Sequence, residues 1–414
     1  MDLELVTIGT ELLLGFTVDT NSAHIGRFLS DRGIRITRRT SVSDDPAAIR
    51  DAISTALDRT GAVLTTGGLG PTRDDISRQV VAELLEMPLV FDESVWQALL
   101  QRFARLGRVP AETNRSQAMV PTGGTILTNR WGSAPGLWLE SPRGLVIMLP
   151  GVPAEMRKLL EHEVAPRLVD RSSGLVIRSA TLRTTGVPES TLAERIGSLE
   201  DELVPLGLAY LPGTTGVDLR LTVWQLPPGE ADARLRDGLD RLRAVVGPCV
   251  YGEGDADLAA VLLDQLRSKG LHLAVAESCT GGLVAERLTE IPGSSEVFLG
   301  GIVSYANKAK IDLLQVAPEV ITRHGAVSAE TAEAMVRGAR ARFGAGVAIA
   351  VTGIAGPDGG TPEKPVGTVW FAFAVGERVE SLMGRFVGSR GEIRARAAQA
   401  ALMGAYRRVE AGER

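Results

Sequence analysis

The sequence predicts an α/β protein in which two α/β domains with mainly parallel sheets are joined by a small α+β domain. Three observations support this fold class: the chain has 414 residues, 44% of them are hydrophobic, and strand-like stretches alternate with helix-like ones at both ends. Such a length suggests two or three domains of roughly 100–200 residues each. Alternating strands and helices are typical of parallel sheets with helical crossovers.

The first domain is expected over residues 1–170. Its helix after Asp45 and Pro46 has a clear start, because aspartate is a good N-cap and proline suits the first helical position. The other expected elements, in chain order, are a strand at 3–8, a helix at 21–31 and strands at 34–40, 62–66 and 145–149.

The alternation breaks at 171–254, where we expect the small α+β domain, and resumes in a third domain at 255–414. Residues 213–216 read Gly-Thr-Thr-Gly directly before a strand-like stretch, which predicts a hairpin turn. The strands expected in the third domain are 271–276, 297–305, 347–351 and 369–375.

Charge and composition exclude several classes of protein. The formal net charge of −5 argues against a protein that holds nucleic acid on a basic surface. No apolar run approaches the roughly 20 residues of a membrane span, and the N-terminus lacks the basic start of a signal peptide, so we expect a cytoplasmic protein. The two cysteines form no Cys-x-x-Cys pair, and the four histidines have no metal-ligand spacing.

Residues 276–282 place two candidate nucleophiles, Ser278 and Cys279, between a strand-like and a helix-like stretch. Free N–H groups at a helix N-terminus can hold an anion or a developing oxyanion, and glycines let a substrate approach the backbone. We therefore expect an active site here, with oxyanion donors among the N–H groups of 279–281. The alternative is an ordinary strand-to-helix turn.

Lysine usage strengthens this hypothesis. Only five of the 45 basic residues are lysine, and two of them are Lys308 and Lys310. An exposed cation can be arginine, but a general base cannot, because guanidinium keeps its proton. A dyad of Ser278 with Lys310 or Lys308 follows as a hypothesis, against the alternative of a solvated helix start.

A second candidate site lies at 65–75, where a glycine-rich loop follows a buried strand. The carboxyl ends of parallel strands are where such folds bind ligands, and the loop's glycines free the backbone to wrap an anion. Carboxylates in and near the loop supply oxygens suited to Mg²⁺ or a similar ion. A tight turn with an acidic helix start is the alternative. The expected metal ligands are Glu11, Asp44, Asp74 and Asp75, and the expected nucleotide and phosphate contacts are Thr10, Gly67, Gly68, Gly70, Thr72, Asn114 and Ser133.

With these motifs together, the sequence resembles the CinA-like family of competence/damage-inducible proteins across nearly its whole length. The motifs that carry the resemblance lie at 8–13, 65–75, 133–136, 149–156, 276–282, 304–308 and 351–357. It implies a molybdopterin-binding-type first domain that hydrolyses ADP-ribose with a divalent metal, a KH-like middle domain, and a third domain that deamidates nicotinamide mononucleotide (NMN) without a cofactor. It also implies a homodimer that acts on small nucleotides. From the net charge and the lack of a membrane-length apolar run we expect neither a nucleic-acid nor a membrane partner.

Carried over to this chain, the resemblance implies Ser278 as nucleophile and Lys310 as base. It implies Arg390 or Arg394 as the partner of the substrate phosphate, although Ser389 stands where the family's usual Gly-Asp-Arg has Asp. The remaining expected substrate contacts are Cys279, Thr280, Gly281, Gly282, Tyr305, Thr352 and Gly353.

Two other functions stay open at this point. The first domain could instead have molybdopterin as its ligand. Metal-dependent release of AMP from ADP-ribose would distinguish the hydrolase from this molybdopterin-binding alternative. The whole chain could instead be a competence-related binding protein with vestigial sites.

Overall fold

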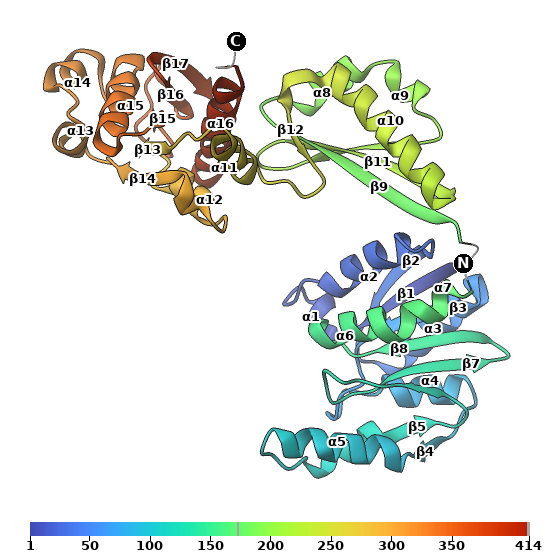
Figure 1. The fold of residues 1–414 in the computed structure, drawn as a ribbon. Coiled ribbons are helices and arrows are strands. Elements are labelled where there is room, and N and C mark those ends of the chain that lie inside the picture. The colour runs from blue at the N-terminus through green and yellow to red at the C-terminus, as the bar shows by residue number, and fades with distance from the viewer. Residues whose placement is uncertain (172–173, 412–414) are drawn as a thin grey trace. The chain divides into compact units, whose positions relative to one another are not determined.

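The structure is a computed structural model that describes residues 1–171 and 174–411. The chain divides into two compact units, Met1–Arg178 with Val223–Arg234 and Ser179–Thr222 with Leu235–Arg414. Figure 1 shows the course of the chain through both. Among the described residues, no helix is both long and apolar enough to cross a membrane.

A six-stranded sheet forms the centre of the first unit, in the order β2-β1-β3-β8-β7-β6. The first four strands are parallel, as expected, whereas β7 and β6 continue the sheet antiparallel. The strands are β1 (Asp2–Ile8), β2 (Arg35–Val42), β3 (Ala62–Thr66), β6 (Thr125–Leu127), β7 (Gly136–Ser141) and β8 (Gly144–Leu149).

Helices cover both faces of this sheet. One hydrophobic core lies under α3, α4 and α5, and a second lies under α2, α6 and α7. The N-cap expected at Asp45 is confirmed, because its carboxylate accepts a hydrogen bond from Ala48 N at 2.8 Å. The remaining elements are α1 (Thr10–Leu13), α2 (Thr20–Ser30), α3 (Pro46–Thr60), α4 (Ser77–Leu84), β4 (Leu89–Phe91), α5 (Glu93–Arg105), β5 (Met119–Pro121), α6 (Pro153–Leu159) and α7 (Ala165–Val169), with a 3₁₀-helix at Glu112–Ala118 and a π-helical stretch at Leu160–Val164.

A four-stranded sheet of order β10-β11-β9-β12 follows, and its strands β9 and β11 belong partly to each unit. The expected hairpin turn is confirmed: Pro212 pairs with Val217, and Gly213 N donates to Gly216 O at 2.8 Å. The elements are β9 (Val176–Thr184), α8 (Glu189–Ile196), α9 (Leu199–Glu202), β10 (Gly207–Pro212), β11 (Val217–Leu226), α10 (Pro228–Val246) and β12 (Val250–Glu253).

The C-terminal part of the second unit contains a five-stranded sheet of order β14-β13-β15-β16-β17. Strands β14, β13 and β15 are parallel, and β16 and β17 are antiparallel. Helices α11, α12 and α16 pack on one face, and α13 and α15 on the other. The elements are α11 (Leu258–Ser268), β13 (Leu273–Glu277), α12 (Leu283–Thr289), β14 (Phe298–Val303), α13 (Asn307–Leu314), α14 (Pro318–His324), α15 (Ala329–Phe343), β15 (Val347–Gly353), β16 (Thr368–Val375), β17 (Arg378–Arg385) and α16 (Arg390–Ala411).

Candidate active sites

Ser278 stands at the carboxyl end of β13, the central strand of the parallel trio. Its main-chain N–H donates to Val351 O at 2.9 Å, which extends the pairing of β13 with β15 by one residue. The residue is 8% exposed. Ser278 is therefore held by the sheet and sheltered from bulk water.

Lys310 reaches Ser278 from the first turns of α13 and is 1% exposed. Its Nζ lies 3.0 Å from Ser278 Oγ, 2.8 Å from Ser304 O and 3.4 Å from Tyr305 O. No carboxylate forms an ion pair with it among the residues that the structure describes. Burial lowers the pKa of Lys310, because the charged ammonium loses its hydration.

This arrangement suits a neutral amine. A neutral lysine retains two N–H donors, which the carbonyls of Ser304 and Tyr305 can accept, and its lone pair is then left for the hydroxyl proton of Ser278. The pair has the geometry of a nucleophile with its base.

The structure decides between the two candidate lysines. Lys308 points away from the site: its side chain is 84% exposed and lies 2.8 Å from the carboxylate of Asp312, one turn along the same helix. Lys310 alone of the two contacts Ser278.

Cys279, the rival nucleophile, is buried in the hydrophobic core that also contains Val284 and Leu288. Burial raises the pKa of its thiol to about 12, so the reactive thiolate is scarce at neutral pH. Its side chain is thus a packing group.

The expectation of free N–H groups at the start of α12 is wrong, because Glu277 occupies them. The buried carboxylate of Glu277 accepts hydrogen bonds from the N–H groups of Gly282 (3.0 Å), Val284 (3.1 Å) and Ala285 (2.9 Å). Gly281 N is also used, because it donates to Ser278 O at 3.0 Å. Sequence reasoning missed this role for Glu277, although an acidic residue just before a helix start was a usable signal.

Because Gly281 N is already used, only two of the three oxyanion donors expected at 279–281 remain. Within the described residues, the N–H groups of Cys279 and Thr280 donate to no main-chain carbonyl. They are the two members of the expected set that remain for this role.

Arg390 and Arg394, the two candidate partners of the substrate phosphate, make different contacts. Arg394 donates from Nε and Nη2 to Thr280 O, at 3.2 and 2.7 Å, and so fixes the turn after Ser278. Arg390 donates to Gly356 O at 2.6 Å and to the Tyr305 hydroxyl at 2.8 Å. Tyr305 as a residue is 58% exposed. Arg390 thus contacts an exposed residue, Tyr305, whereas Arg394 contacts Thr280, which is fully buried.

Ser389, the departure from the family pattern, helps to start α16. Its N–H and its hydroxyl both donate to the carboxylate of Glu392, at 2.8 and 2.7 Å.

Thr352 and Gly353 end β15 next to Ser278. The Thr352 hydroxyl donates to Ala326 O at 2.7 Å, which ties the strand end to the turn before α15. A side chain at Gly353 would place Cβ 2.8 Å from Thr368 O, so the close pairing with β16 requires glycine.

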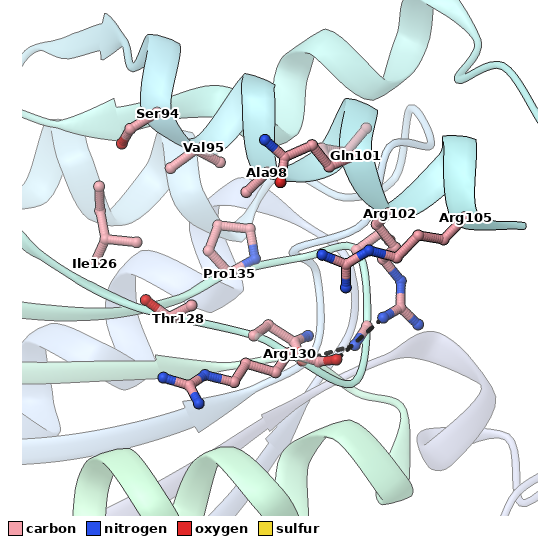
Figure 2. Close-up of a pocket in the computed structure, with 14 residues that line it drawn as sticks. Ser94, Val95, Ala98, Gln101, Arg102, Arg105, Ile126, Thr128, Arg130 and Pro135 are labelled. Atoms are coloured by element: carbon pink, nitrogen blue, oxygen red, sulfur yellow. Dashed lines mark hydrogen bonds between the residues drawn. The ribbon is translucent and has the colours of Figure 1, made fainter.

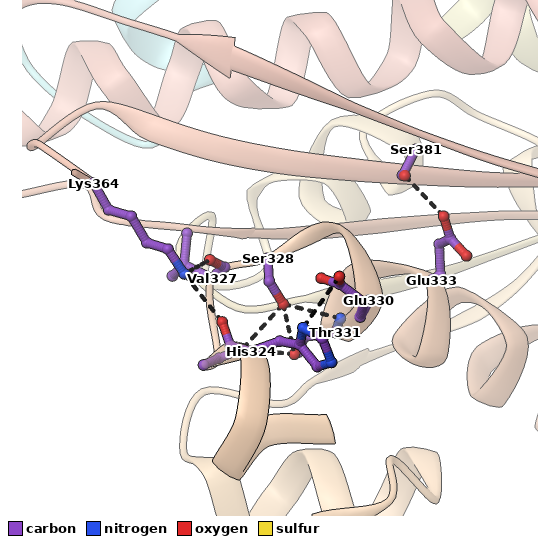
Figure 3. A network of polar contacts seen from close by, with 9 residues as sticks. His324, Val327, Ser328, Glu330, Thr331, Glu333, Lys364 and Ser381 are labelled. Carbon is purple, nitrogen blue, oxygen red and sulfur yellow. Dashed lines mark hydrogen bonds and ion pairs between the residues drawn. The ribbon is translucent and has the colours of Figure 1, made fainter. Parts of the chain in front are cut away.

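Lys364 ties the following loop to the same turn. Its Nζ donates to His324 O at 3.0 Å and to Val327 O at 2.8 Å, and Figure 3 shows it spanning from the loop to the end of α14. Beside it, His324 lies 3.1 Å from Glu330, and Ser328 caps α15 through Thr331 N. The loop at 354–367 is therefore attached to this turn through Lys364, next to Thr352 at the end of β15, and Arg390 holds the loop again through Gly356 O.

In the first unit, the carboxyl ends of β1, β2 and β3 meet at one edge of the sheet. Thr10, after β1, donates from its N–H and its hydroxyl to Asp44 Oδ2, after β2, at 2.9 Å each. Next to them, Gly67 has φ of 109°, and a Cβ there would lie 2.1 Å from Ile8 O. The loop after β3 therefore approaches β1 as closely as only glycine allows.

Ser77 and Arg78, at the start of α4, pack against the rest of the glycine loop. Gly68 has φ of 66°, with Ser77 Oγ 1.9 Å from where its Cβ would lie. Buried Arg78 donates to Leu69 O at 2.9 Å and to Ser116 O at 2.5 Å, and burial lowers its pKa to about 10. Arg78 was missed from the sequence, and it links the loop to the segment that carries Asn114.

The four predicted metal ligands do not form a ready-made cage. Among the described residues, no group of three or more His, Cys, Asp or Glu gathers to hold a metal ion. Glu11 and Asp74 are exposed, while Asp44 and Asp75 each use Oδ2 to bind a threonine, Thr10 and Thr72. Mg²⁺ is often held by only one or two carboxylates together with substrate phosphates, and the free oxygens of Asp44 and Asp75 fit that mode.

Asn114 and Ser133 are connected through one intermediate residue. Asn114 Nδ2 donates to Gln117 Oε1 at 3.0 Å, and Gln117 Nε2 donates to Ser133 Oγ at 3.3 Å. The structure therefore brings these two predicted residues into one polar network.

Three family descriptions match successive parts of the chain. Residues 4–170 match "Probable molybdopterin binding domain", residues 179–252 match "Damage-inducible protein CinA KH domain", and residues 255–409 match "CinA C-terminal domain".

Similar proteins align along nearly the whole chain. A CinA-like protein of Gemmatimonas aurantiaca is 54% identical over 406 residues, which cover 97% of this chain and 95% of that protein. A CinA-like protein of Salinibacter ruber is 43% identical over 392 residues, covering 94% and 95%. The solved structure of the competence/damage inducible protein CihA from Agrobacterium tumefaciens is 44% identical and covers 38% of this chain and 94% of that one, with a TM-score of 0.35.

Proposed function

The chain belongs to the CinA-like family, and we propose that its C-terminal part is an amidohydrolase that converts NMN to nicotinic acid mononucleotide and ammonia. The observation that carries the proposal is the contact between Lys310 Nζ and Ser278 Oγ at 3.0 Å. A buried lysine with a lowered pKa is a competent base for a serine hydroxyl.

The chemistry proceeds in two halves. Ser278 Oγ attacks the carboxamide carbon while neutral Lys310 takes the hydroxyl proton. Lys310 then returns that proton to the amide nitrogen, the C–N bond breaks, and ammonia leaves a nicotinoyl ester on Ser278. Water attacks the ester carbon, Lys310 accepts its proton and passes it to Ser278 Oγ, and the acid is released.

The contacts around the dyad support roles for the neighbouring groups. Cys279 and Thr280 offer N–H groups to the oxyanion. Both arginines donate to a main-chain carbonyl, but Arg390 also lies beside the exposed Tyr305, and we assign the substrate phosphate to Arg390 for that reason.

The test is ammonia release from NMN by the full-length protein and by its Ser278→Ala variant. Ser268→Ala, on the exposed end of α11, is the matched control, and thermal melting shows that all three proteins are folded. Release by the wild type and the control but not by Ser278→Ala supports the proposal. If no protein releases ammonia, the proposed reaction is wrong; if all three do, another nucleophile acts.

For the first unit we propose metal-dependent hydrolysis of ADP-ribose to AMP and ribose 5-phosphate. Support comes from the contact of Thr10 with Asp44 beside the glycine loop at the ends of β1, β2 and β3. A bound Mg²⁺ would neutralise the charge of the phosphate oxygens, and Asp44 and Asp75 would hold it. The loop's N–H groups would position the pyrophosphate.

Two measurements test this second activity. AMP release should require added Mg²⁺ and stop with EDTA, while ammonia release from NMN should continue in EDTA. Binding of a molybdopterin without any AMP release would instead favour the alternative ligand for this unit.

A further inference from the structure

The cavity between α5 and the loop at 128–135 belongs to the site already described in the first unit, because Ser133 is among its lining residues. Figure 2 shows Arg102, Arg105 and Arg130 around it. The hairpin at 213–216 is part of neither proposed site, yet it contacts α16, the helix that carries Arg390. The two sites therefore leave the role of this hairpin in the second unit unexplained.

The hairpin is held firmly by the end of β9 and the residue after it. Thr185 is buried, and its Oγ1 donates to Thr215 O at 2.6 Å. A Cβ at Gly216 would lie 2.0 Å from Thr184 O, so the close approach of the two segments requires glycine. The main-chain carbonyl of Thr214, between these two attachments, is accordingly an acceptor in a fixed place.

Arg396, in the second turn of α16, joins the hairpin to the segment that precedes this helix. Its Nε donates to Thr214 O at 3.1 Å, and its Nη1 donates to Val387 O. Its Nη2 lies 3.8 Å from the carboxylate of Glu392, one turn back along α16. A guanidinium group has several donors in one rigid plane. Arg396 therefore ties together the hairpin, the segment before α16 and the first turn of α16.

The groups that Arg396 holds lie on both sides of Arg390 in the sequence. Val387 comes three residues before it, and Glu392 comes two residues after it. The carboxylate of Glu392 also accepts hydrogen bonds from the N–H and the hydroxyl of Ser389, the residue next to Arg390, at 2.8 and 2.7 Å. The main chain from which Arg390 extends is thus set by contacts that lead back to the hairpin.

We propose that Arg396 is a positioning residue through which the hairpin of the middle domain holds Arg390 in place for the substrate phosphate. The proposal rests on the proposed deamidation of NMN. A phosphate partner that is ordered before the ligand arrives binds with a lower entropic cost. The contacts of Arg390 with Tyr305 and Gly356 O aim its guanidinium group, and Arg396 fixes the main chain behind it.

Steady-state ammonia release from NMN by the full-length protein tests the proposal, with Arg396→Gln compared with Arg407→Gln. Arg407 is a matched control, because it also lies on α16 and donates to a main-chain carbonyl of the middle domain, Pro248 O, at 2.8 Å, but near the other end of the helix. Arg396→Gln should raise KM for NMN about tenfold and leave kcat nearly unchanged, since it displaces the phosphate partner and spares the Ser278–Lys310 dyad. Arg407→Gln should leave both constants unchanged.

A double-mutant cycle with Arg390→Gln shows whether Arg396 acts through Arg390. Once Arg390 has been replaced, adding Arg396→Gln should lower kcat/KM for NMN by less than about twofold, because the interaction that it supports is already lost. A second loss of about tenfold in that background would mean that the two arginines act independently, and it would overturn the proposal.

Hydrogen exchange gives a reading that does not depend on catalysis. Peptides from 386–393 and 213–217 should exchange faster in Arg396→Gln than in Arg407→Gln. The side chain of Arg396 is 31% exposed, so the substitution should preserve folding, which melting curves can verify.

The outcomes separate this proposal from the proposed function. A wild type that releases no ammonia from NMN would show that the proposed function is wrong, and the role of Arg396 would fall with it. An active wild type beside an Arg396→Gln variant with the KM of the control would overturn this proposal alone. Equal exchange at 386–393 in the two variants would also overturn it.

Discussion

The carbonyl oxygen of Ser304 accepts a hydrogen bond from Lys310 Nζ at 2.8 Å, within 0.2 Å of the 3.0 Å that separates the same nitrogen from Ser278 Oγ. Ser304 is itself fixed, because its N–H donates to Glu277 O at 2.8 Å. The main chain therefore orients the base, and the base faces the serine.

Replacing Lys310 should abolish deamidation. Lys310→Arg keeps a cation but cannot give up its proton, and Lys310→Met keeps most of the volume without an amine. Loss of a general base costs about 10²–10⁴-fold in rate. Steady-state ammonia release measures this, with Lys308→Arg as control. Turnover by Lys310→Arg at a rate near that of the control would remove Lys310 from the mechanism.

Deamidation should rise with pH until Lys310 is neutral and then level off. Because burial lowers the pKa of Lys310, the midpoint of this rise should lie below the ordinary lysine value of 10.5. A profile of kcat/KM for NMN against pH measures it. A midpoint at or above pH 10.5 would contradict the lowered pKa.

The same shift makes stability depend on pH. Between the lowered folded-state pKa and the unfolded value, the unfolded chain binds more protons, so the free energy of unfolding should increase as pH rises. Lys310→Met should flatten that part of the curve in chemical denaturation. An identical slope in both proteins would contradict the shift.

Cys279→Ala should retain most of the amidase activity. The thiol packs in the core and its pKa is raised to about 12, so it supplies little thiolate. Removing its sulfur should cost about 1 kcal/mol of stability. Ammonia release before and after iodoacetamide treatment of the folded wild type gives a second reading. Inactivation of the wild type, but not of Cys279→Ala, would point to a catalytic thiol.

Glu277→Gln should destabilise the second unit. Its buried carboxylate accepts hydrogen bonds from three main-chain N–H groups, and an amide presents a donor where an oxygen was. We expect a loss of about 2–3 kcal/mol in the free energy of unfolding. Glu286→Gln, exposed on the same helix, should stay within about 0.5 kcal/mol. Equal stability of the two variants would show that the capping bonds contribute little.

Lys364→Met should loosen the loop at 354–367. Loss of the bonds to His324 O and Val327 O removes one of the attachments of this loop, and misplaced substrate contacts lower the rate. We expect faster hydrogen exchange in that loop and a drop of about tenfold in kcat/KM for NMN. Lys308→Met is the control for loss of a lysine. Unchanged exchange would mean that the remaining attachments, among them the bond from Arg390 to Gly356 O, hold the loop without Lys364.

Much of the fold follows from local patterns. The apolar strands at 62–66 and 347–351, the cap at Asp45 and the turn at 213–216 all lie where the sequence predicts them, because short-range sterics and hydrogen bonding decide such features. The expected strand at 271–276 begins only at Leu273. The direction of individual strands was harder to predict from the sequence. Strands β7 and β16 run antiparallel to β8 and β15, because strand direction depends on pairing between segments rather than on local sequence.

By itself, the sequence determined the family, the alternation of strands and helices, and the segments that carry nucleophiles, glycines and carboxylates. Only the tertiary structure decided which of these groups act together. Lys310 rather than Lys308 meets Ser278 across 32 residues, Cys279 turns into the core, and Glu277 fills the helix N-terminus that seemed free for a ligand. The physical reason is that contact and burial, which set both reach and pKa, depend on elements far apart in the chain.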